Sequence, residues 1–386
     1  MEKISVIIPA AAHTVQYLRD CLHSISKSTY RNLEIIIVYS GEPEHLQPEI
    51  EEYKSDIILY PVEFTTLSEA RNAGFFSAVG EFVSFFNAED INGKMRLELS
   101  MKRFENNPLV GMVFCGNTFI NEQGGFLTGV SKFPGFSPNT FLGRMFEHNR
   151  INTISTTLIR SSLIKKLGGF DKTFPSAEEY DIYLRLGSIA KVDYIDLPLV
   201  RNRQINHLNG AWRQTVSEWM VKAIQKHNPE DIAAHLSRVY QREEDFRIAF
   251  GKLLYRIGMV EEAIRQLMKA QKINRTNEEA YFLTGNCYLT LNNYTRAMEE
   301  YGRCLALNPE HPGCLNNVGV LYFYMGEYKR SIIELEKAVH YEKEHSEAYY
   351  NLTCIKDARQ QENLRLAVFS PASVFTDNGI ECEYVS

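Results

Sequence analysis

The sequence predicts two domains of different fold class, an α/β domain with a mostly parallel sheet and helices on both faces, followed by an all-α solenoid of helical repeats. Up to about Pro198, apolar stretches alternate with segments of helical spacing, which is typical of an α/β sheet. After about Asp245, similar residues recur every 34 positions, which is typical of stacked helix pairs. A chain of 386 residues is long enough for both domains.

The strands expected in the first domain are short apolar stretches that predict buried parallel strands. They cover residues 4–9, 33–38, 56–60 and 81–86. Helical spacing between them predicts helices over Tyr17–Ser28 and Leu67–Val79. Ligands bind at the carboxyl ends of the strands in such sheets. We therefore expect the binding site at Pro9–His13, Tyr39–Glu42 and Asn87–Asp90.

Residues that recur every 34 positions mark the expected helix contacts of the second domain, and three of the four sets are small residues. The matching positions are Gly251, Gly285 and Gly319; Ala263, Ala297 and Ser331; Leu267, Tyr301 and Leu335; and Ala270, Cys304 and Ala338. This pattern resembles tetratricopeptide repeats, with three repeats and a partial fourth from Ala348. Such arrays form grooved surfaces that bind peptides, and we expect Asn286, Asn317 and Tyr324 to be exposed there. Alternatively, the repeats bury a homodimer interface or brace the first domain.

Four segments are expected along the chain. They are the α/β domain over residues 1–210, connecting helices over 211–245, the repeats over 246–362 and a C-terminal tail over 363–386.

Composition argues against several classes of protein. A net charge of −6 gives no general attraction to nucleic acid or to an anionic membrane. No apolar run approaches the roughly 20 residues that span a bilayer, and the N-terminus has no signal-peptide pattern. Seven cysteines without a C-x-x-C pair fit reduced thiols, so we expect a cytoplasmic protein.

The most informative stretches are Ser68–Gly74, which contains one arginine, and Gly80–Asp90, which ends in carboxylates. The first predicts a helix, and the second predicts a buried strand with oxygen ligands at its carboxyl end. Such a strand end is suited to hold a metal ion and a phosphate ester.

Together with the strand Ile4–Pro9 and the segment Thr29–Val38, these stretches resemble family 2 glycosyltransferases over about residues 3–210. The resemblance implies the GT-A fold, which is Rossmann-like. It also implies an inverting transfer of a sugar from a nucleotide-diphosphate sugar, a UDP-sugar being expected, to an acceptor. Repeats fused to such a domain are similar to transferases that modify a protein or peptide presented by the repeats.

The resemblance also assigns roles in donor binding. The implied donor-binding residues are Pro9, Tyr39, Arg71, Asn87 and Glu89. Tyr39 stands where the family has a base-reading Asp, so stacking or a hydroxyl hydrogen bond would replace that contact. Asn87 replaces the first Asp of the Asp-x-Asp site. Arg71 would pair with the diphosphate or brace the acidic residues, and the alternative is a structural ion pair.

A metal ion follows from the same resemblance. Glu89 takes the position of the principal metal ligand, which implies Mn²⁺ or Mg²⁺, and His207 is a second candidate ligand.

The acceptor side of the expected site lies later in the chain. Gly168–Asp171 and Glu178–Leu186 resemble the family in spacing and in residue type, and Glu179 takes the position of the catalytic base. Glu178 and Asp181 are expected to cap and brace the helix N-terminus. The alternative function is a catalytically impaired scaffold or binding protein, which Tyr39 and Asn87 favour.

Overall fold

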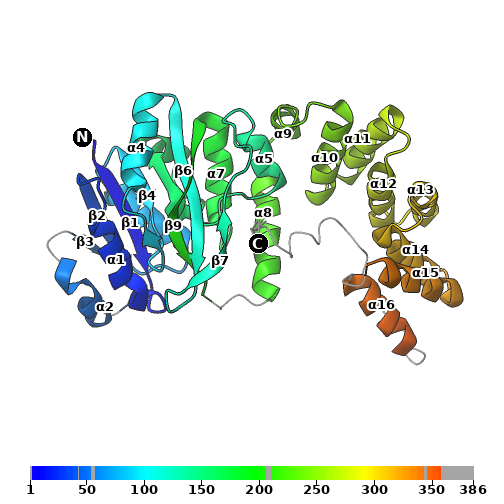
Figure 1. The fold of residues 1–386 in the computed structure, drawn as a ribbon, viewed down its shortest axis with the longest axis horizontal. Coiled ribbons are helices and arrows are strands. Elements are labelled where there is room, and N and C mark those ends of the chain that lie inside the picture. Colours follow the sequence, from blue (N-terminus) through cyan, green and yellow to red (C-terminus); the bar gives the residue numbers. More distant parts are fainter. Residues whose placement is uncertain (1, 42, 54–56, 206–209, 343–345, 358–386) are drawn as a thin grey trace. The chain divides into compact units, whose positions relative to one another are not determined.

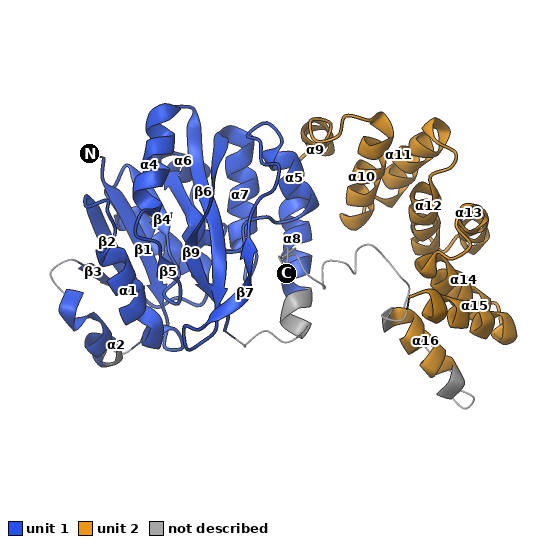
Figure 2. Cartoon of the chain, viewed as in Figure 1, with its two compact units in different colours: residues 1–227, 378–386 blue, residues 228–377 orange. Residues whose placement is uncertain are grey.

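The computed structural model forms two compact units that divide after His227 (Figure 2). The structure describes residues 2–41, 43–53, 57–205, 210–342 and 346–357. The division falls inside the segment 211–245, where connecting helices are expected. The C-terminal tail expected over 363–386 lies outside the described residues.

The first unit alternates strands and helices, as the sequence predicts. Its strands are β1 (Ile4–Ala10), β2 (Leu33–Tyr39), β3 (Ile57–Pro61), β4 (Phe82–Phe85), β5 (Ile91–Asn92), β6 (Val110–Ile120), β7 (Phe126–Ser131), β8 (Thr157–Arg160) and β9 (Lys191–Arg203). Its helices are α1 (Leu18–Ser26), α2 (Pro43–Ile50), α3 (Leu67–Ser77), α4 (Arg96–Asn106), α5 (Phe141–Glu147), α6 (Ser161–Leu167), α7 (Glu178–Ile189) and α8 (Gly210–Gln225). The expected strands β1 to β4 and the expected helices α1 and α3 are confirmed.

The nine strands of the described residues belong to one sheet, in the order β3-β2-β1-β4-β8-β6-β9-β5, with β7 paired to β6. Strands β3, β2, β1 and β4 are parallel, in agreement with the prediction. The second half of the sheet is mixed, because β8 runs antiparallel to both β4 and β6. There, β7 returns directly along β6 after a tight turn at Asn121–Gly125, and no crossover helix lies between them.

Helices cover both faces of this sheet (Figure 1). On one face, α1 and α4 pack against alternate strand residues such as Val6 and Phe82. On the other face, α3 lies so close that a Cβ at Gly74 would be 2.6 Å from Ile7 and 2.7 Å from Val38. Because both faces are covered, polar ligand contacts concentrate at the edges where the strands end.

The second unit is a series of helices. They are α9 (Pro229–Leu236), α10 (Glu243–Arg256), α11 (Val260–Ile273), α12 (Glu278–Thr290), α13 (Tyr294–Leu307), α14 (Pro312–Tyr324), α15 (Tyr328–Tyr341) and α16 (Ser346–Asp357). From α10 onward, the part of the chain that the structure describes forms three helix pairs and the first helix of a fourth. In each pair, the repeat glycine touches the large residue that the period predicts: a Cβ at Gly285, for example, would lie 2.5 Å from the Tyr301 ring. The predicted repeat architecture is confirmed.

The expectation that Asn286 and Asn317 are exposed is wrong. Their exposed fractions are 1% and 0%. Asn317 Nδ2 donates to Asn286 Oδ1 at 2.8 Å, and the Tyr301 hydroxyl donates to the same oxygen at 2.7 Å. The two amides therefore connect α12 to α14 and belong to the packing of successive repeats. Tyr324, in contrast, is 51% exposed, as expected.

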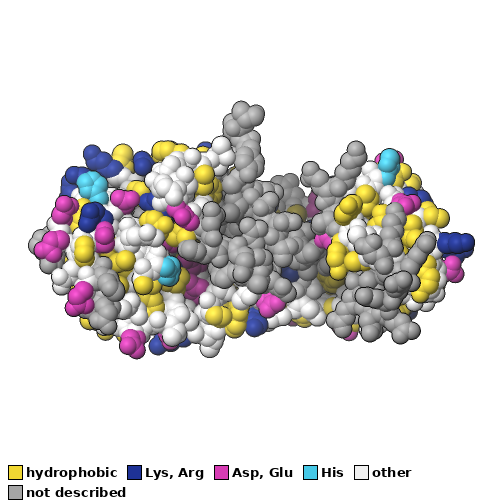
Figure 3. Space-filling view, turned by 90° about the horizontal axis from the view of Figure 1, so that it is seen from below, with side chains coloured by type: hydrophobic (Ala, Val, Ile, Leu, Met, Phe, Trp, Pro, Cys, Tyr) yellow, Lys and Arg dark blue, Asp and Glu magenta, His cyan; other side chains and the backbone are white. Residues whose placement is uncertain are grey.

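The surface mixes charges of both signs with hydrophobic side chains. Figure 3 shows lysine, arginine, aspartate and glutamate side chains interspersed on one face of the molecule. Within the described residues, no helix combines the length and the apolar character needed to cross a bilayer.

Candidate functional site

The expected site lies at one edge of the sheet, where three parallel strands end. Ala10 at the end of β1 pairs with Tyr39 at the end of β2, and Ile7 pairs with Phe85 of β4. This register brings the carboxyl ends of β1, β2 and β4 together, so Pro9, Tyr39 and Asn87 follow the same edge.

Arg71 joins three segments that are far apart in the sequence. It lies on α3, whose N-terminus is fixed by a capping box between Thr66 and Glu69. Its side chain is 0% exposed. Nη1 donates to Glu178 Oε1 at 2.6 Å, whereas Nη2 donates to Glu179 Oε1 at 2.6 Å and to Asn87 Oδ1 at 3.0 Å. The arginine therefore positions the acceptor-side glutamates beside the end of β4.

Asn72 makes a second connection between the same parts of the chain. Its Nδ2 donates to the Phe170 carbonyl, and the Phe170 N–H donates to its Oδ1, both at 2.8 Å. Gly169 has a φ of +85°, and a Cβ there would lie 2.4 Å from Asn72 Oδ1. The two sequence motifs that contain Arg71 and Gly169 thus form one contact, which explains why this contact requires a glycine.

The helix α7 begins in an unusual way. Ala177, just before it, has a φ of 59°, in the left-handed region that residues other than glycine rarely adopt. Glu178 then pairs with Arg71, and Asp181 accepts from Arg185 and Lys226. These contacts replace the capping role that the sequence predicts for the two acids.

Glu179 has the environment that a general base needs. Its Oε2 accepts the Ile154 N–H at 3.0 Å, and its side chain is 22% exposed. Burial raises the pKa of Glu179 to about 7; Glu178 adds to the rise, whereas Arg71 opposes it. A carboxylate with a pKa near the working pH exchanges protons efficiently and remains partly ionised.

Glu89 is an acid without a counter-charge. Burial, followed by the nearby Asp90, raises the pKa of Glu89 to about 8. Within the described residues, Glu89 forms no ion pair. Arg71 already pairs with Glu178 and Glu179, so its charge only partly offsets the rise in the pKa of Glu89. A divalent cation would supply the missing positive charge, and Glu89 therefore fits the metal-ligand position that the resemblance implies.

Asp90 differs from Glu89 in its hydrogen bonds. Its Oδ2 accepts from the Thr153 hydroxyl at 2.8 Å, and its Oδ1 accepts from Asn202 Nδ2 at 2.9 Å and from the Arg203 N–H at 3.1 Å. Burial raises its pKa, and these hydrogen bonds oppose the rise. Because both oxygens have donors, Asp90 holds the end of the sheet together.

The sequence analysis did not predict the residues that hold Glu89 and Asp90 in position. Arg203 donates through Nε to the Glu89 carbonyl at 3.0 Å and through Nη1 to the Glu122 carbonyl at 2.7 Å. Thr153 also accepts from Asn87 Nδ2 at 3.3 Å. No motif indicates these partners, since they come from loops and from the end of β9, more than 60 positions from Asp90.

The remaining predicted site residues differ in accessibility. Tyr39 is 2% exposed and belongs to the main core cluster, and Pro9 is buried in β1. Asn87 uses its amide in contacts with Arg71 and Thr153. Their roles toward a donor stay predictions, and His207 lies outside the described residues.

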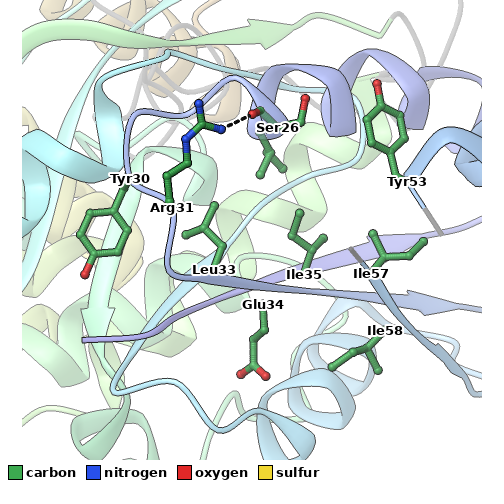
Figure 4. A pocket seen from close by; sticks show the side chains of 10 residues that line it. Ser26, Tyr30, Arg31, Leu33, Glu34, Ile35, Tyr53, Ile57 and Ile58 are labelled. Atoms are coloured by element: carbon green, nitrogen blue, oxygen red, sulfur yellow. Dashed lines mark hydrogen bonds between the residues drawn. The ribbon is translucent and has the colours of Figure 1, made fainter. Parts of the chain in front are cut away.

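A cavity of about 410 Å³ lies elsewhere in the first unit. Its lining includes Leu33 and Ile57, the first residues of β2 and β3, and Ser26 at the end of α1 (Figure 4). Arg31 Nη1 donates to the Ser26 carbonyl at 2.9 Å at its rim. Because it adjoins the amino ends of the strands, this cavity is separate from the acidic site.

A sheet of this order, with acidic side chains gathered at its carboxyl edge, defines the GT-A class of fold. Residues 5–168 match the model of glycosyl transferase family 2, and the domain that they form belongs to this family. Residues 257–338 match the family model described as anaphase-promoting complex, cyclosome, subunit 3, within the helical repeats.

Each of three curated relatives matches about half of this chain. An uncharacterized glycosyltransferase of Rickettsia typhi is 25% identical over 205 residues, which are 52% of this chain and 63% of that protein. One of Methanocaldococcus jannaschii is 26% identical over 217 residues, 53% of this chain and 72% of that protein. A tetratricopeptide repeat-containing protein of Caenorhabditis elegans, trd-1, is 22% identical over 204 residues, 52% of this chain and 24% of that protein. The chain thus spans less than two thirds of the Rickettsia relative.

Solved structures resemble the chain at low sequence identity. Residues 1–349 of TarS from S. aureus give a TM-score of 0.49 at 16% identity, covering 89% of this chain and 93% of that one. The mannosyltransferase PcManGT from Pyrobaculum calidifontis, in complex with GDP-Man and Mn²⁺, gives 0.46 at 16% identity, covering 79% and 87%.

Proposed function

We propose that this protein is an inverting glycosyltransferase that moves a sugar from a nucleotide-diphosphate sugar, a UDP-sugar, to an acceptor nucleophile. The observation that carries the proposal is the environment of Glu179. This carboxylate is largely buried, held by Arg71 and by the Ile154 N–H, and has a pKa of about 7. Glu179 takes the proton of the acceptor as its oxygen attacks the anomeric carbon from the side opposite the leaving diphosphate.

Arg71 is a positioning residue in this proposal. Its guanidinium is fully buried, and both of its terminal nitrogens are already used. Its Nε is buried without a hydrogen-bond partner, so Arg71 would meet a diphosphate only if the ligand reached into this buried site. The arrangement instead fixes one Glu179 oxygen, and the Ile154 N–H fixes the other. A base held at both oxygens has a defined direction toward the acceptor.

A divalent cation, Mn²⁺ or Mg²⁺, would be held by Glu89. When bound, such an ion would supply positive charge to a leaving diphosphate. Within this chain, Glu89 is oriented by the Arg203 contact to its carbonyl and by the hydrogen bonds that fix its neighbour Asp90.

A thermal-unfolding series with nucleotide sugars, each with and without Mn²⁺, tests the donor part of the proposal. A ligand at 100 times its Kd stabilises the native state by about 2.7 kcal/mol. We expect a UDP-sugar to raise the unfolding temperature more with Mn²⁺ than without it, and Glu89→Gln to remove the difference. If no nucleotide sugar stabilises the protein, the proposal that a donor binds at this site is wrong.

The second candidate function is a transferase-fold scaffold without catalysis. Two observations favour it: Tyr39, which replaces the base-reading Asp, is buried, and the amide of Asn87 is used within the site. A scaffold would bind a nucleotide sugar yet neither hydrolyse it nor transfer the sugar. Release of nucleotide diphosphate over hours, at a rate above that of buffer, separates the two functions.

The repeats are the proposed binding surface for a protein or peptide acceptor. Large side chains on successive helices are more than half exposed, among them Tyr324, Tyr328 and Tyr349. We expect Tyr324→Ser with Tyr328→Ser to lower transfer to a protein acceptor and to leave donor hydrolysis unchanged. Unchanged transfer would favour the homodimer or bracing alternative.

The six cysteines of the described residues are free thiols, which supports the proposed cytoplasmic location.

A further inference from the structure

Three soft metal ligands meet at the turn between α13 and α14. The sulfurs of Cys304 and Cys314 and an imidazole nitrogen of His311 all lie within 4.8 Å of one another. Both cysteines are fully buried, and His311 is half-buried. All three come from one short stretch, the end of one helix and the start of the next, so bringing them together requires little loss of chain entropy.

The neighbouring repeats show what packing alone requires at these positions. One period earlier, alanines stand at both cysteine positions, Ala270 and Ala280. One period later, Ala338 and Ala348 stand there and share one core cluster. The fold therefore brings these two positions together and needs only a methyl group at each.

The histidine position differs from the cysteine positions, because one period later His345 keeps a histidine where both cysteines are alanines. Asn277 stands one period before His311 and caps α12 by accepting the Ala280 N–H at 3.2 Å. His311 caps α14 in the same way, with Nδ1 accepting the Cys314 N–H at 3.2 Å. An asparagine thus suffices for capping. Nδ1 has one electron pair, which here accepts the Cys314 N–H, so a metal ion bound at Nδ1 would take the place of this hydrogen bond.

We propose that Cys304, His311 and Cys314 form a binding site for a thiophilic metal ion, with Zn²⁺ as the ligand of best fit. Two thiolates and one imidazole are ligands that zinc prefers, and three protein ligands leave its fourth position to water. In a tetrahedral site with bonds of about 2.0–2.3 Å, donor atoms lie about 3.4–3.8 Å apart. Since 4.8 Å is the upper limit of the present separations, the cluster has to contract by at most about 1.4 Å to reach this geometry.

The proposed ion would link the last turn of α13 to the first turn of α14. It is independent of the acidic site, because that site offers oxygen ligands and lies in the other unit. Binding replaces two S–H protons by one ion and needs no oxidant.

The test uses the full-length protein, reduced and freed of metal, titrated with Co²⁺ as a spectroscopic probe. We expect thiolate-to-cobalt charge-transfer absorption that saturates at about one Co²⁺ per chain and is lost when Zn²⁺ displaces the probe. The neighbouring repeats supply the variants: Cys304→Ala with Cys314→Ala, and His311→Asn. The double variant should lose the absorption, and His311→Asn should weaken Co²⁺ binding at least tenfold with the helix content unchanged.

Two controls separate this site from others. Cys287→Ala removes another buried thiol of the same unit and should leave the absorption unchanged. Glu89→Gln removes the proposed oxygen ligand of the first unit and should also leave it unchanged. The proposal is overturned if the reduced protein shows no thiolate-to-cobalt absorption, if His311→Asn binds Co²⁺ as tightly as the parent, or if the cysteine pair only forms a disulfide under oxidation.

Discussion

The acidic site of the first unit and the helix contacts of the second are held together in opposite ways. Arg71 reaches Glu178 and Glu179, which lie more than 100 positions later in the chain. In the second unit, Gly285 touches Tyr301 within the same repeat, and similar contacts recur in each repeat. The first arrangement exists only when the whole sheet is complete, whereas the second is built from neighbours. A substitution in the acidic site should therefore destabilise the whole first unit. A substitution at a helix contact of the second unit should affect mainly its own repeat.

The largest effect is expected at the base itself. Glu179→Gln keeps the shape of the side chain but cannot take a proton, so we expect transfer to fall by about 10²–10⁴-fold, with donor binding retained. Glu178→Gln is the matched control, since it removes the same charge from the same arginine. Initial rates for both variants decide: equal losses would assign the effect to the ion pair, and Glu179 would not be the base.

The next effect is on stability. Arg71→Met leaves Glu178 and Glu179 without their partner in a buried site, and losing one partner of a buried ion pair costs about 3–5 kcal/mol. Urea unfolding of the first unit measures the loss. A loss of stability below about 1 kcal/mol would show that the ion pairs of Arg71 with Glu178 and Glu179 are not what joins α3 to α7.

The corresponding change in the second unit should be smaller and confined to it. Gly285→Ala places a methyl group against the buried Tyr301 ring, which is fixed by its hydrogen bond to Asn286, so we expect a cost of about 1–3 kcal/mol. Gly302→Ala, on α13 with nothing within 4 Å, should instead stabilise by about 0.5–1 kcal/mol. Donor hydrolysis should not change in either variant. If Gly285→Ala lowers it, the local character of the repeat contacts is contradicted.

The last prediction concerns pH, and its effect is about tenfold for each pH unit. Because Glu179 must be ionised to act and its pKa is about 7, the rate should rise about tenfold per pH unit below 7 and level off above it. Stability has the opposite trend: the folded state holds this proton more tightly than the unfolded state, so stability falls as pH rises from about 4.5 toward 7. Rate profiles and urea midpoints at several pH values check both directions. A rate that is flat from pH 5 to 8 would exclude Glu179 as the titrating group.

The same contrast explains how much could be predicted from the sequence. The repeats were predictable because each contact repeats at a fixed spacing, so Gly285 and its counterparts mark helix pairs directly. The burial of Asn286 and Asn317 was not, since a polar residue on a helix indicates a surface unless its partner on the next helix is known. The parallel strands β1 to β4 were predictable from their apolar stretches.

Within the site, Arg71, Glu89 and Glu179 could be predicted as functional residues because each belongs to a sequence motif. Their positions relative to one another could not be predicted. That Arg71 lies between two glutamates, or that Thr153 and Arg203 hold Asp90, depends on loops whose positions follow from the complete sheet. The left-handed turn at Ala177 has no sequence signal either, since alanine rarely adopts it.

The paired contacts of Arg71 and Asn72 also bear on the order in which the chain refolds. Helix pairs with local contacts form quickly, whereas contacts between residues 100 positions apart require the closure of long loops and form late. After dilution from denaturant, most of the helical signal should therefore return before the long-range contacts of Arg71 and Asn72 form. The proposed transfer activity, which would need these contacts, should then be the slowest property to recover and would report directly on the completed chain topology.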